Sequence, residues 1–245
     1  MTTRKIALVT GATRGIGKEA ATQLAQKGFT VLVAGRSLEQ AAKVAENLKN
    51  AGHSAQAVKL DITQSSDIAD VVAEIGKTFG KLDILVNNAG VQLEGDWGQN
   101  NAASVSQQQL RETFAINLFA QVELTQSFLP LLRKSDDAQI LNVSSIVGSL
   151  QTHADTSSPW GAVKPFAYNA SKAALNLYTI SLAQALAGDG IRVASVHPGW
   201  VKTDLGTDAA PLTIAEGAQT ITELATNQYG QDSGGFYHLG ENQPW

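Results

Sequence analysis

The sequence contains no cysteine, which excludes disulfide bonds and any reaction that depends on a thiol. It has no long run of lysine and arginine, and its formal net charge is −4, which argues against nucleic acid or an anionic membrane as a partner. No apolar stretch reaches the roughly 18 residues that a membrane-spanning helix needs. The 4 histidines show no metal-ligand spacing, so no metal site is expected.

The residues that are present are typical of a globular protein, with 43% hydrophobic and 16% charged side chains. A chain of 245 residues suffices for a large core, and we expect a single domain over residues 1–245. Residues 1–5 run directly into an apolar segment, so no signal peptide is expected. Together with the missing cysteines, this favours a cytoplasmic protein.

Short apolar segments alternate with longer helical ones along the chain. This alternation predicts an α/β fold of the doubly wound, Rossmann type, in which helices cover both faces of a parallel sheet. The expected strands are 5–10, 30–34, 57–60, 82–86, 139–144, 191–196 and 235–239. The expected helices are 18–25, 38–50, 66–79, 110–133 with a break at Pro130, and 167–187.

A glycine-rich turn, 11–17, joins the first strand to the first helix. Gly11 permits a tight turn, while Gly15 and Gly17 allow a pyrophosphate to approach the backbone and the helix to pack on the strand. The helix N-terminus then offers N–H groups and a favourable dipole to the phosphates. The spacing Gly-x-x-x-Gly-x-Gly differs from the commoner Gly-x-Gly-x-x-Gly, but its context is that of a dinucleotide fingerprint.

Gly35 and Arg36 end the second strand, where an acidic residue would hold the free ribose 2′-hydroxyl of NAD. Glycine removes the carboxylate that would repel a 2′-phosphate, and a guanidinium forms bidentate contacts with one. Arg14, within the glycine turn, is a candidate second cation. We therefore expect NADP(H) rather than NAD(H).

Tyr168 and Lys172 are four residues apart, so on a helix both side chains lie on one face. An ammonium close to a phenol favours the phenolate and is expected to lower the phenol pKa from about 10 toward neutrality. Tyr168 is therefore a candidate proton donor and acceptor.

These motifs, in this order, resemble those of the single-domain short-chain dehydrogenase/reductase family over most of the chain, from about Ile6 to Val201. The resemblance implies an oxidoreductase with a nicotinamide cofactor, in particular a carbonyl reductase. It assigns catalytic roles to Asn117, Ser145, Tyr168 and Lys172. It assigns cofactor binding to Gly11, Thr13, Arg14, Gly15, Ile16, Gly17, Arg36, Asp61, Ile62, Asn88, Ala89, Gly90, Tyr168, Lys172, Pro198, Gly199, Val201 and Thr203.

The roles that the resemblance implies follow ordinary acid–base chemistry. Hydride from NADPH would reach the carbonyl carbon of an aldehyde or ketone while Tyr168 protonates the oxygen and Ser145 hydrogen-bonds it. Lys172 would lower the Tyr168 pKa and hold the nicotinamide ribose, and Asn117 would hold a water that links Lys172 to solvent. Ser144 and Ser145 point to opposite faces of a strand, so only one can serve, and the family position favours Ser145.

Two segments depart from the minimal family pattern, namely 150–165 and 91–109. The first is an insertion that is expected to be a loop over the active site. It resembles the longer insertion of monomeric carbonyl reductases, which favours a monomer over a tetramer and leaves a dimer possible. The second is polar, contains Trp97 and is a candidate rim of the substrate cleft. Trp245, at the end of the sequence, is expected to be disordered.

Two alternatives remain open at this stage. A 3-oxoacyl carrier-protein reductase shares these motifs, but Asp189 stands where such enzymes carry a basic residue that docks the acidic carrier. A non-catalytic NADP(H)-sensing module is the other, although a sensor would need none of the four catalytic side chains.

Overall fold

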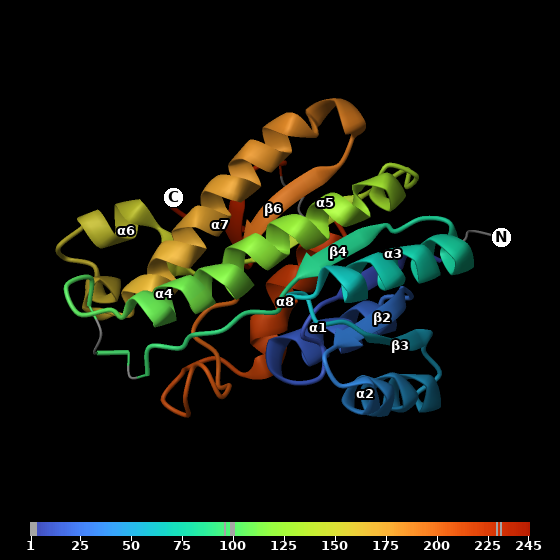
Figure 1. Cartoon of the computed structure of the whole chain (residues 1–245), viewed down its shortest axis with the longest axis horizontal. Helices are drawn as coiled ribbons and strands as arrows, with labels where there is room; N and C mark the ends of the chain where they lie inside the picture. The colour runs from blue at the N-terminus through green and yellow to red at the C-terminus, as the bar shows by residue number, and fades with distance from the viewer. Residues whose placement is uncertain (1–3, 96, 99–100, 229, 231) are drawn as a thin grey trace.

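The computed structural model describes residues 4–95, 97–98, 101–228, 230 and 232–245. In these residues eight strands form one sheet in the order β3-β2-β1-β4-β5-β6-β7-β8 (Figure 1). Every pairing from β3 to β7 is parallel, and only β8 runs antiparallel to its neighbour. The strands are β1 (Ile6–Val9), β2 (Thr30–Gly35), β3 (Ala55–Lys59), β4 (Ile84–Asn87), β5 (Gln139–Val143), β6 (Arg192–Val196), β7 (Phe236–His238) and β8 (Glu241–Asn242). The expected doubly wound α/β fold is confirmed.

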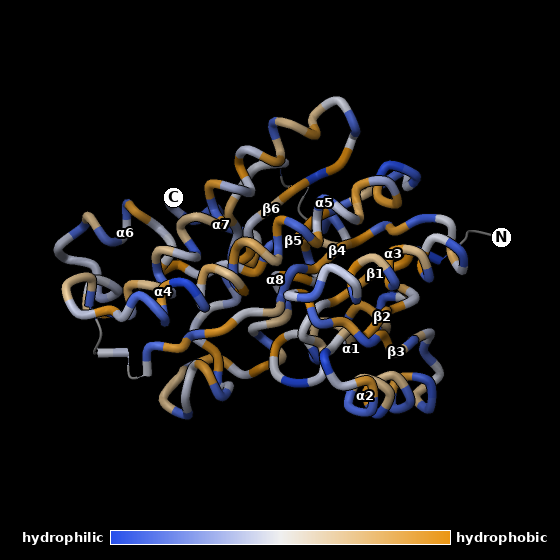
Figure 2. The backbone as a smooth tube through the Cα atoms, in the orientation of Figure 1, coloured by the Kyte–Doolittle hydropathy of each residue, from blue (hydrophilic) through white to orange (hydrophobic). Residues whose placement is uncertain are grey.

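Helices cover both faces of this sheet, because the fully buried strands carry apolar side chains on both sides. On one face Ala7 and Val9 pack with α1 (Gly15–Gln26), α2 (Leu38–Asn50) and α8 (Ile214–Ala225). On the other, Ile6 and Leu8 pack with α3 (Ser65–Phe79), α5 (Ala120–Leu132) and α7 (Phe166–Ala185). In Figure 2 the central strands are mostly hydrophobic, and α2 is hydrophilic on its outer side.

The helical stretch expected over 110–133 is divided, but not where Pro130 predicted. It consists of α4 (Gln107–Phe114), the π-helical turn η1 (Ala115–Phe119) and α5, and Pro130 lies within α5. Pro130 is close to the C-terminal end of α5, and its missing N–H and its ring affect only the carbonyl four residues earlier, so the helix continues to Leu132. The break falls instead at η1, which holds Asn117.

The insertion 150–165 is not the plain loop that its composition predicts. It contains α6 (Leu150–Ala154) and a short 3-10 helix at Pro159–Ala162. Ser149 and Ser158 start these two helices, because each side-chain oxygen accepts a hydrogen bond from a first-turn amide.

Helix α8 was not expected, although its sequence carries a start signal. Thr213 and Glu216 form a reciprocal capping box in which the Thr213 hydroxyl accepts from the Glu216 amide and the Glu216 carboxylate accepts from the Thr213 amide. The face of α8 that packs on α1 is buried. A capping box followed by apolar residues at helical spacing is therefore the sequence signal that identifies this helix.

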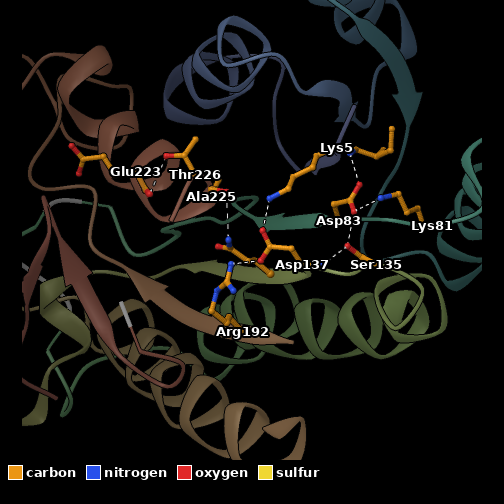
Figure 3. A network of polar contacts seen from close by, with 11 residues as sticks. Lys5, Lys81, Asp83, Ser135, Asp137, Arg192, Glu223, Ala225 and Thr226 are labelled. Atoms are coloured by element: carbon orange, nitrogen blue, oxygen red, sulfur yellow. Dashed lines mark hydrogen bonds and ion pairs between the residues drawn. The ribbon is translucent and has the colours of Figure 1, made fainter. Parts of the chain in front are cut away.

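Charged side chains tie the amino-terminal ends of the central strands together (Figure 3). Asp137 pairs with both Lys5 and Arg192, which joins the starts of β1, β5 and β6. Asp83 accepts hydrogen bonds from the amide of Ile6 at 2.7 Å and from the Lys81 ammonium at 2.7 Å. Ion pairs therefore join the strands at their amino-terminal ends. Ligands of parallel sheets of this type bind at the opposite, carboxyl ends of the strands.

Candidate functional site

The predicted site residues gather at the carboxyl ends of β1, β4, β5 and β6, where parallel sheets of this type bind their ligands. The glycine turn follows β1, Asn88 follows β4, Ser145 follows β5 and Pro198 follows β6. The strand order places β1 and β4 side by side although their connections run in opposite directions along the sheet. In sheets of this type, the point where the strand order reverses leaves a crevice that binds a dinucleotide.

The glycine turn has the backbone that its sequence requires. Gly11 and Gly15 adopt positive φ angles of 63° and 54°, which side chains with a Cβ rarely adopt. A Cβ on Gly17 would lie 2.3 Å from Nδ2 of Asn88 and 2.6 Å from the carbonyl oxygen of Gly11, so only glycine fits there. No described side chain caps the N-terminus of α1. Its first amides are thus a suitable site for the pyrophosphate of a dinucleotide.

Thr10 joins the glycine turn to the Asn88 segment and was missing from the predicted site residues. Its hydroxyl accepts from the amides of Asn88 and Ala89, both at 3.0 Å, and donates to the carbonyl of Val86 at 3.2 Å. The Asn88 side chain donates in return to the carbonyl of Thr10 at 2.8 Å. A threonine at the end of a buried strand was the available signal, because a buried hydroxyl must find partners.

Arg36 is exposed directly after β2 and forms no ion pair with any described residue. A Cβ on Gly35 would lie 2.5 Å from Cγ2 of Thr13, so the glycine lets the turn pack against the strand end. Arg14 pairs with Asp204 instead of standing alone as a second cation. Thr203 faces Gly15, with its methyl 3.7 Å from the position of a Cβ there, so the segment after β6 closes over the glycine turn.

Tyr168 and Lys172 are buried side chains of α7, and the half-buried Ser145 meets them from the end of β5. Tyr168 is 7% exposed and its hydroxyl is hydrogen-bonded to Ser145, whereas the Ser144 hydroxyl donates to the backbone carbonyl of Lys172 at 3.4 Å. The two serines therefore point in different directions, and it is Ser145 that reaches the phenol. Gly148 allows this turn to approach α7, since a Cβ there would lie 2.7 Å from the carbonyl carbon of Lys172.

The expected fall in the Tyr168 pKa is wrong for this structure. Burial raises the pKa of the phenol to about 12, and only the Ser145 hydrogen bond opposes this shift. Lys172 Nζ lies 5.6 Å from the ring centroid and donates to the carbonyl of Val143 at 2.7 Å, and burial lowers its pKa to about 8. Desolvation thus outweighs the expected influence of the ammonium, and Tyr168 is a neutral phenol at pH 7.

Asn117 lies in η1, 1% exposed, close to Lys172. Its carboxamide accepts from the amide of Val91 at 2.9 Å and donates to the carbonyl of Val91 at 2.8 Å and to the Ser171 hydroxyl at 3.0 Å. A Cβ on Gly90 would lie 3.3 Å from Oδ1 of Asn117 and 3.6 Å from Nζ of Lys172. The absent side chain at Gly90 therefore leaves the space between these two groups clear.

The remaining cofactor candidates lie on segments that border the crevice. The Asp61 carboxylate accepts from the amide and the hydroxyl of Thr63, at 3.0 and 2.7 Å, and Ile62 packs in the core beneath it. Pro198 and Val201 are buried. Gly199 has a φ of 86°, and a Cβ there would lie 2.2 Å from Cδ1 of Leu212.

His197 accepts hydrogen bonds at Nδ1 from the amides of Ile146 and Gly199, each at 3.3 Å. It thereby joins the turn after Ser145 to the Pro198 segment, a role that the metal-oriented sequence argument did not foresee. Burial and, to a lesser degree, the nearby His238 lower its pKa to about 3, so the ring is neutral at pH 7.

Aromatic side chains border the Tyr168 phenol. The rings of Trp97 and Tyr168 meet edge to face with centroids 5.4 Å apart, and Trp160 packs on the same cluster. Trp245 is not disordered as expected, because its ring stacks on Phe236 at 5.5 Å and its carbonyl accepts from the amide of Gln151. The predicted cleft rim 91–109 does reach Tyr168 through Trp97, but Asp96, Gln99 and Asn100 lie outside the described residues.

Among the described residues, no three histidine or acidic side chains are grouped so that they could hold a metal ion. Across the same part of the chain, no helix has the length and apolar character needed to cross a membrane.

Comparison with known proteins gives the same assignment as the geometry. The sequence matches the family model described as short chain dehydrogenase over residues 5–211. It is 33% identical to a 3-oxoacyl-[acyl-carrier-protein] reductase of Staphylococcus aureus, over 94% of this chain and 86% of that protein.

Solved structures agree along almost the whole chain. The NADPH-bound carbonyl reductase from chicken fatty liver superimposes with a TM-score of 0.86 at 28% identity and covers 99% of both chains. Carbonyl reductase Sniffer of D. melanogaster gives 0.82 at 30% identity, again over 99% of both. The chain belongs to the short-chain dehydrogenase family and is an oxidoreductase of that family.

Proposed function

We propose that this protein is an NADPH-dependent carbonyl reductase that converts aldehydes or ketones to alcohols. The observation that carries the proposal is that Ser145, half-buried just after β5, meets the buried side chains of Tyr168 and Lys172 from α7. A phenol with a pKa of about 12 is protonated at neutral pH, which is the form that a proton donor needs in the reductive direction.

The chain's own residues fit the proposed cofactor. The glycine cradle at Gly11 and Gly17 admits no Cβ, and the uncapped N-terminus of α1 suits the pyrophosphate. The exposed guanidinium of Arg36 supports NADP(H) over NAD(H), because it would bind the 2′-phosphate. We further propose Asp61 and Ile62 for the adenine. The nicotinamide half would lie against Asn88, Ala89, Gly90, Pro198, Gly199, Val201 and Thr203.

When bound, NADPH supplies the hydride for the carbonyl carbon. Tyr168 would donate its phenolic proton to the carbonyl oxygen, and Ser145 would hydrogen-bond the same oxygen and stabilise the charge that develops there. Lys172, whose pKa of about 8 leaves it mostly protonated at pH 7, would favour the phenolate that remains. The gap at Gly90 between Lys172 and Asn117 would admit the water that returns the proton.

The surroundings of the phenol support a substrate with apolar or aromatic parts. Trp97, Trp160 and Val163 pack on the same cluster as Tyr168. Trp200 and Leu205, which follow Pro198 closely in the sequence, are exposed apolar side chains. Apolar walls with few polar groups are typical of small-molecule pockets. Two of the structural relatives are carbonyl reductases by name, which agrees with this class.

The test is NADPH oxidation with a panel of aromatic and aliphatic aldehydes and ketones. We expect turnover by the wild type and loss of at least about a hundredfold in kcat in Tyr168→Phe, which lacks the proton. Tyr178→Phe, on the same helix α7, is the matched control and should keep wild-type activity. Binding of NADPH without turnover of any carbonyl compound would favour the sensing module instead.

A 3-oxoacyl carrier-protein reductase remains the second candidate, because the Staphylococcus aureus relative bears that name. Against it, an acidic residue, Asp189, stands where such a reductase would carry a basic docking residue. Asp189 also pairs with Arg133 at 2.9 Å, so this ion pair offers no net positive charge to an acidic carrier. Comparing kcat/KM for an acyl carrier-protein thioester with that for a free ketone separates the two. A preference for the carrier-bound substrate would replace our proposal. We also expect a monomer, to be checked by analytical ultracentrifugation.

A further inference from the structure

Glu94 is a carboxylate in the interior, 1% exposed, on the segment that follows β4. Transfer of a carboxylate out of water is costly unless strong hydrogen bonds replace its hydration. Glu94 makes such bonds to the backbone of α7. Its Oε1 accepts from the amide of Ala167 at 3.0 Å and its Oε2 from the amide of Tyr168 at 2.9 Å.

Helix α7 needs this acceptor because its own sequence supplies none. Pro165 stands at the N-cap, makes no side-chain cap, and the first turn contains no acidic residue. The free N–H groups and the positive end of the helix dipole therefore face Glu94. Its carboxylate accepts hydrogen bonds from these N–H groups and interacts favourably with the dipole, so it stabilises the start of α7. The cap comes from a residue 73 positions earlier in the chain, so it ties the β4 segment to α7.

The backbone of Tyr168 is held on its other side as well. Its carbonyl accepts from the Ser171 hydroxyl at 2.7 Å, and that hydroxyl accepts from the Asn117 carboxamide at 3.0 Å. Asn117 in turn holds Val91 at both its amide and its carbonyl, and Val91 begins the segment that carries Glu94. The contacts close a ring through Asn117, Val91, Glu94 and Tyr168.

We propose that Glu94 is a positioning residue that fixes the backbone of Tyr168 and thereby aims the phenol at the reacting oxygen. This inference rests on the proposed reductase function, because it assigns Tyr168 the proton transfer. Glu94 itself touches no reacting atom and acts only through Tyr168. A displacement of the phenol of about 1 Å is enough to cost roughly a hundredfold in rate.

Amide hydrogen exchange tests the structural half of the proposal without any substrate. Glu94→Gln keeps the shape of the side chain but loses its charge and one of its two acceptors. We expect the amides of Ala167 and Tyr168 to exchange at least about tenfold faster in this variant. Glu94→Asp keeps the charge on a shorter side chain, so its exchange rates for these two amides should lie between those of Glu94→Gln and the wild type. Unchanged exchange in Glu94→Gln would overturn the proposal.

Steady-state kinetics test the functional half, with a carbonyl substrate that the wild type turns over. We expect kcat to fall about tenfold or more in Glu94→Gln, with the Kd for NADPH unchanged within about twofold. The solvent deuterium isotope effect on kcat should rise, because proton transfer becomes slower relative to the other steps. A variant that is only less stable would not change that isotope effect.

Glu74→Gln is the matched control, since it makes the same charge change at a carboxylate that accepts from Gln56 at 3.0 Å on the exposed side of α3. It should keep wild-type kcat and wild-type exchange in α7. Faster exchange in Glu94→Gln with wild-type kcat, or an equal loss of kcat in Glu74→Gln, would refute the positioning role. If the wild type reduces no carbonyl compound, the proposed function fails, whereas the exchange measurement still decides whether Glu94 caps α7.

Discussion

Acid should destabilise this protein through His197 in particular. The folded protein keeps the ring neutral, with a pKa lowered to about 3 chiefly by burial, whereas an unfolded histidine titrates near 6.5. Between these values the unfolded chain binds a proton that the folded chain does not, so stability falls as the pH falls. The contribution is fully present above pH 6.5 and is lost progressively below it.

The size of the effect follows from the pKa difference. Over the full range from 6.5 to about 3 the linkage approaches about 5 kcal/mol, at roughly 1.4 kcal/mol per pH unit. Between pH 7 and pH 5 it amounts to about 2 kcal/mol, because at pH 5 the unfolded imidazole is almost fully protonated and the folded one is not. The structural reason is that Nδ1 of His197 accepts hydrogen bonds from the amides of Ile146 and Gly199. In a protonated ring Nδ1 carries a hydrogen, so it would face these two N–H donors without accepting from either.

His197→Asn isolates this contribution, because Asn keeps an acceptor near the position of Nδ1 but does not titrate. The measurement is the free energy of unfolding from urea denaturation at several pH values from 5 to 8. Carboxylates contribute to the acid slope of both proteins, so the difference between the two slopes reports His197. We expect the variant to lose about 2 kcal/mol less than the wild type between pH 7 and pH 5. Parallel slopes would refute the reasoning.

Three further predictions concern the site and its scaffold. Gly148→Ala should destabilise the fold by about 1–3 kcal/mol in urea denaturation, because the new Cβ meets the α7 backbone at 2.7 Å, while Gly161→Ala, with open space around it, should not. Arg36→Asp should shift the ratio of kcat/KM values toward NADH by exchanging an attraction to the 2′-phosphate for a repulsion, and an unchanged ratio would remove Arg36 from cofactor choice. Asp137→Asn should lower the free energy of unfolding by about 1 kcal/mol at pH 7, because it removes the ion pairs with Lys5 and Arg192 (Figure 3). Burial raises the pKa of Asp137, but these two partners hold it below its usual value. The difference in stability between variant and wild type should therefore vanish only well below pH 3.8, where acid protonates Asp137.

The sequence predicted those features that depend on neighbouring residues. Strand β2 and helix α2 lie where the apolar periods placed them, since burial on both faces requires a continuous apolar run and a helix requires its 3.6-residue repeat. Gly11 and Gly15 have the positive φ angles that a tight turn implies. The spacing of Tyr168 and Lys172 likewise brings both into one buried group on α7.

Contacts between distant segments were beyond that reasoning. Helix α7 begins at a proline with no acceptor of its own, and the carboxylate that caps it comes from the β4 segment. Trp97, Trp160 and Trp245 lie far apart in the sequence, yet all three pack against the one cluster that contains Tyr168 and Phe236. Nothing in a local pattern says which loops meet, because loop paths are set by packing and not by periodicity.

The sequence by itself therefore determined the layered fold, the glycine turn and the grouping of Tyr168 with Lys172 on one helix, because each depends on residues a few positions apart. Only the tertiary structure decided the protonation state of Tyr168. The sequence places an ammonium near a phenol and so predicts a lowered pKa, but the fold buries Tyr168 and directs Lys172 to the Val143 carbonyl, and desolvation raises the pKa instead. Desolvation depends on every segment packed around a group, and that information exists only once the chain has folded.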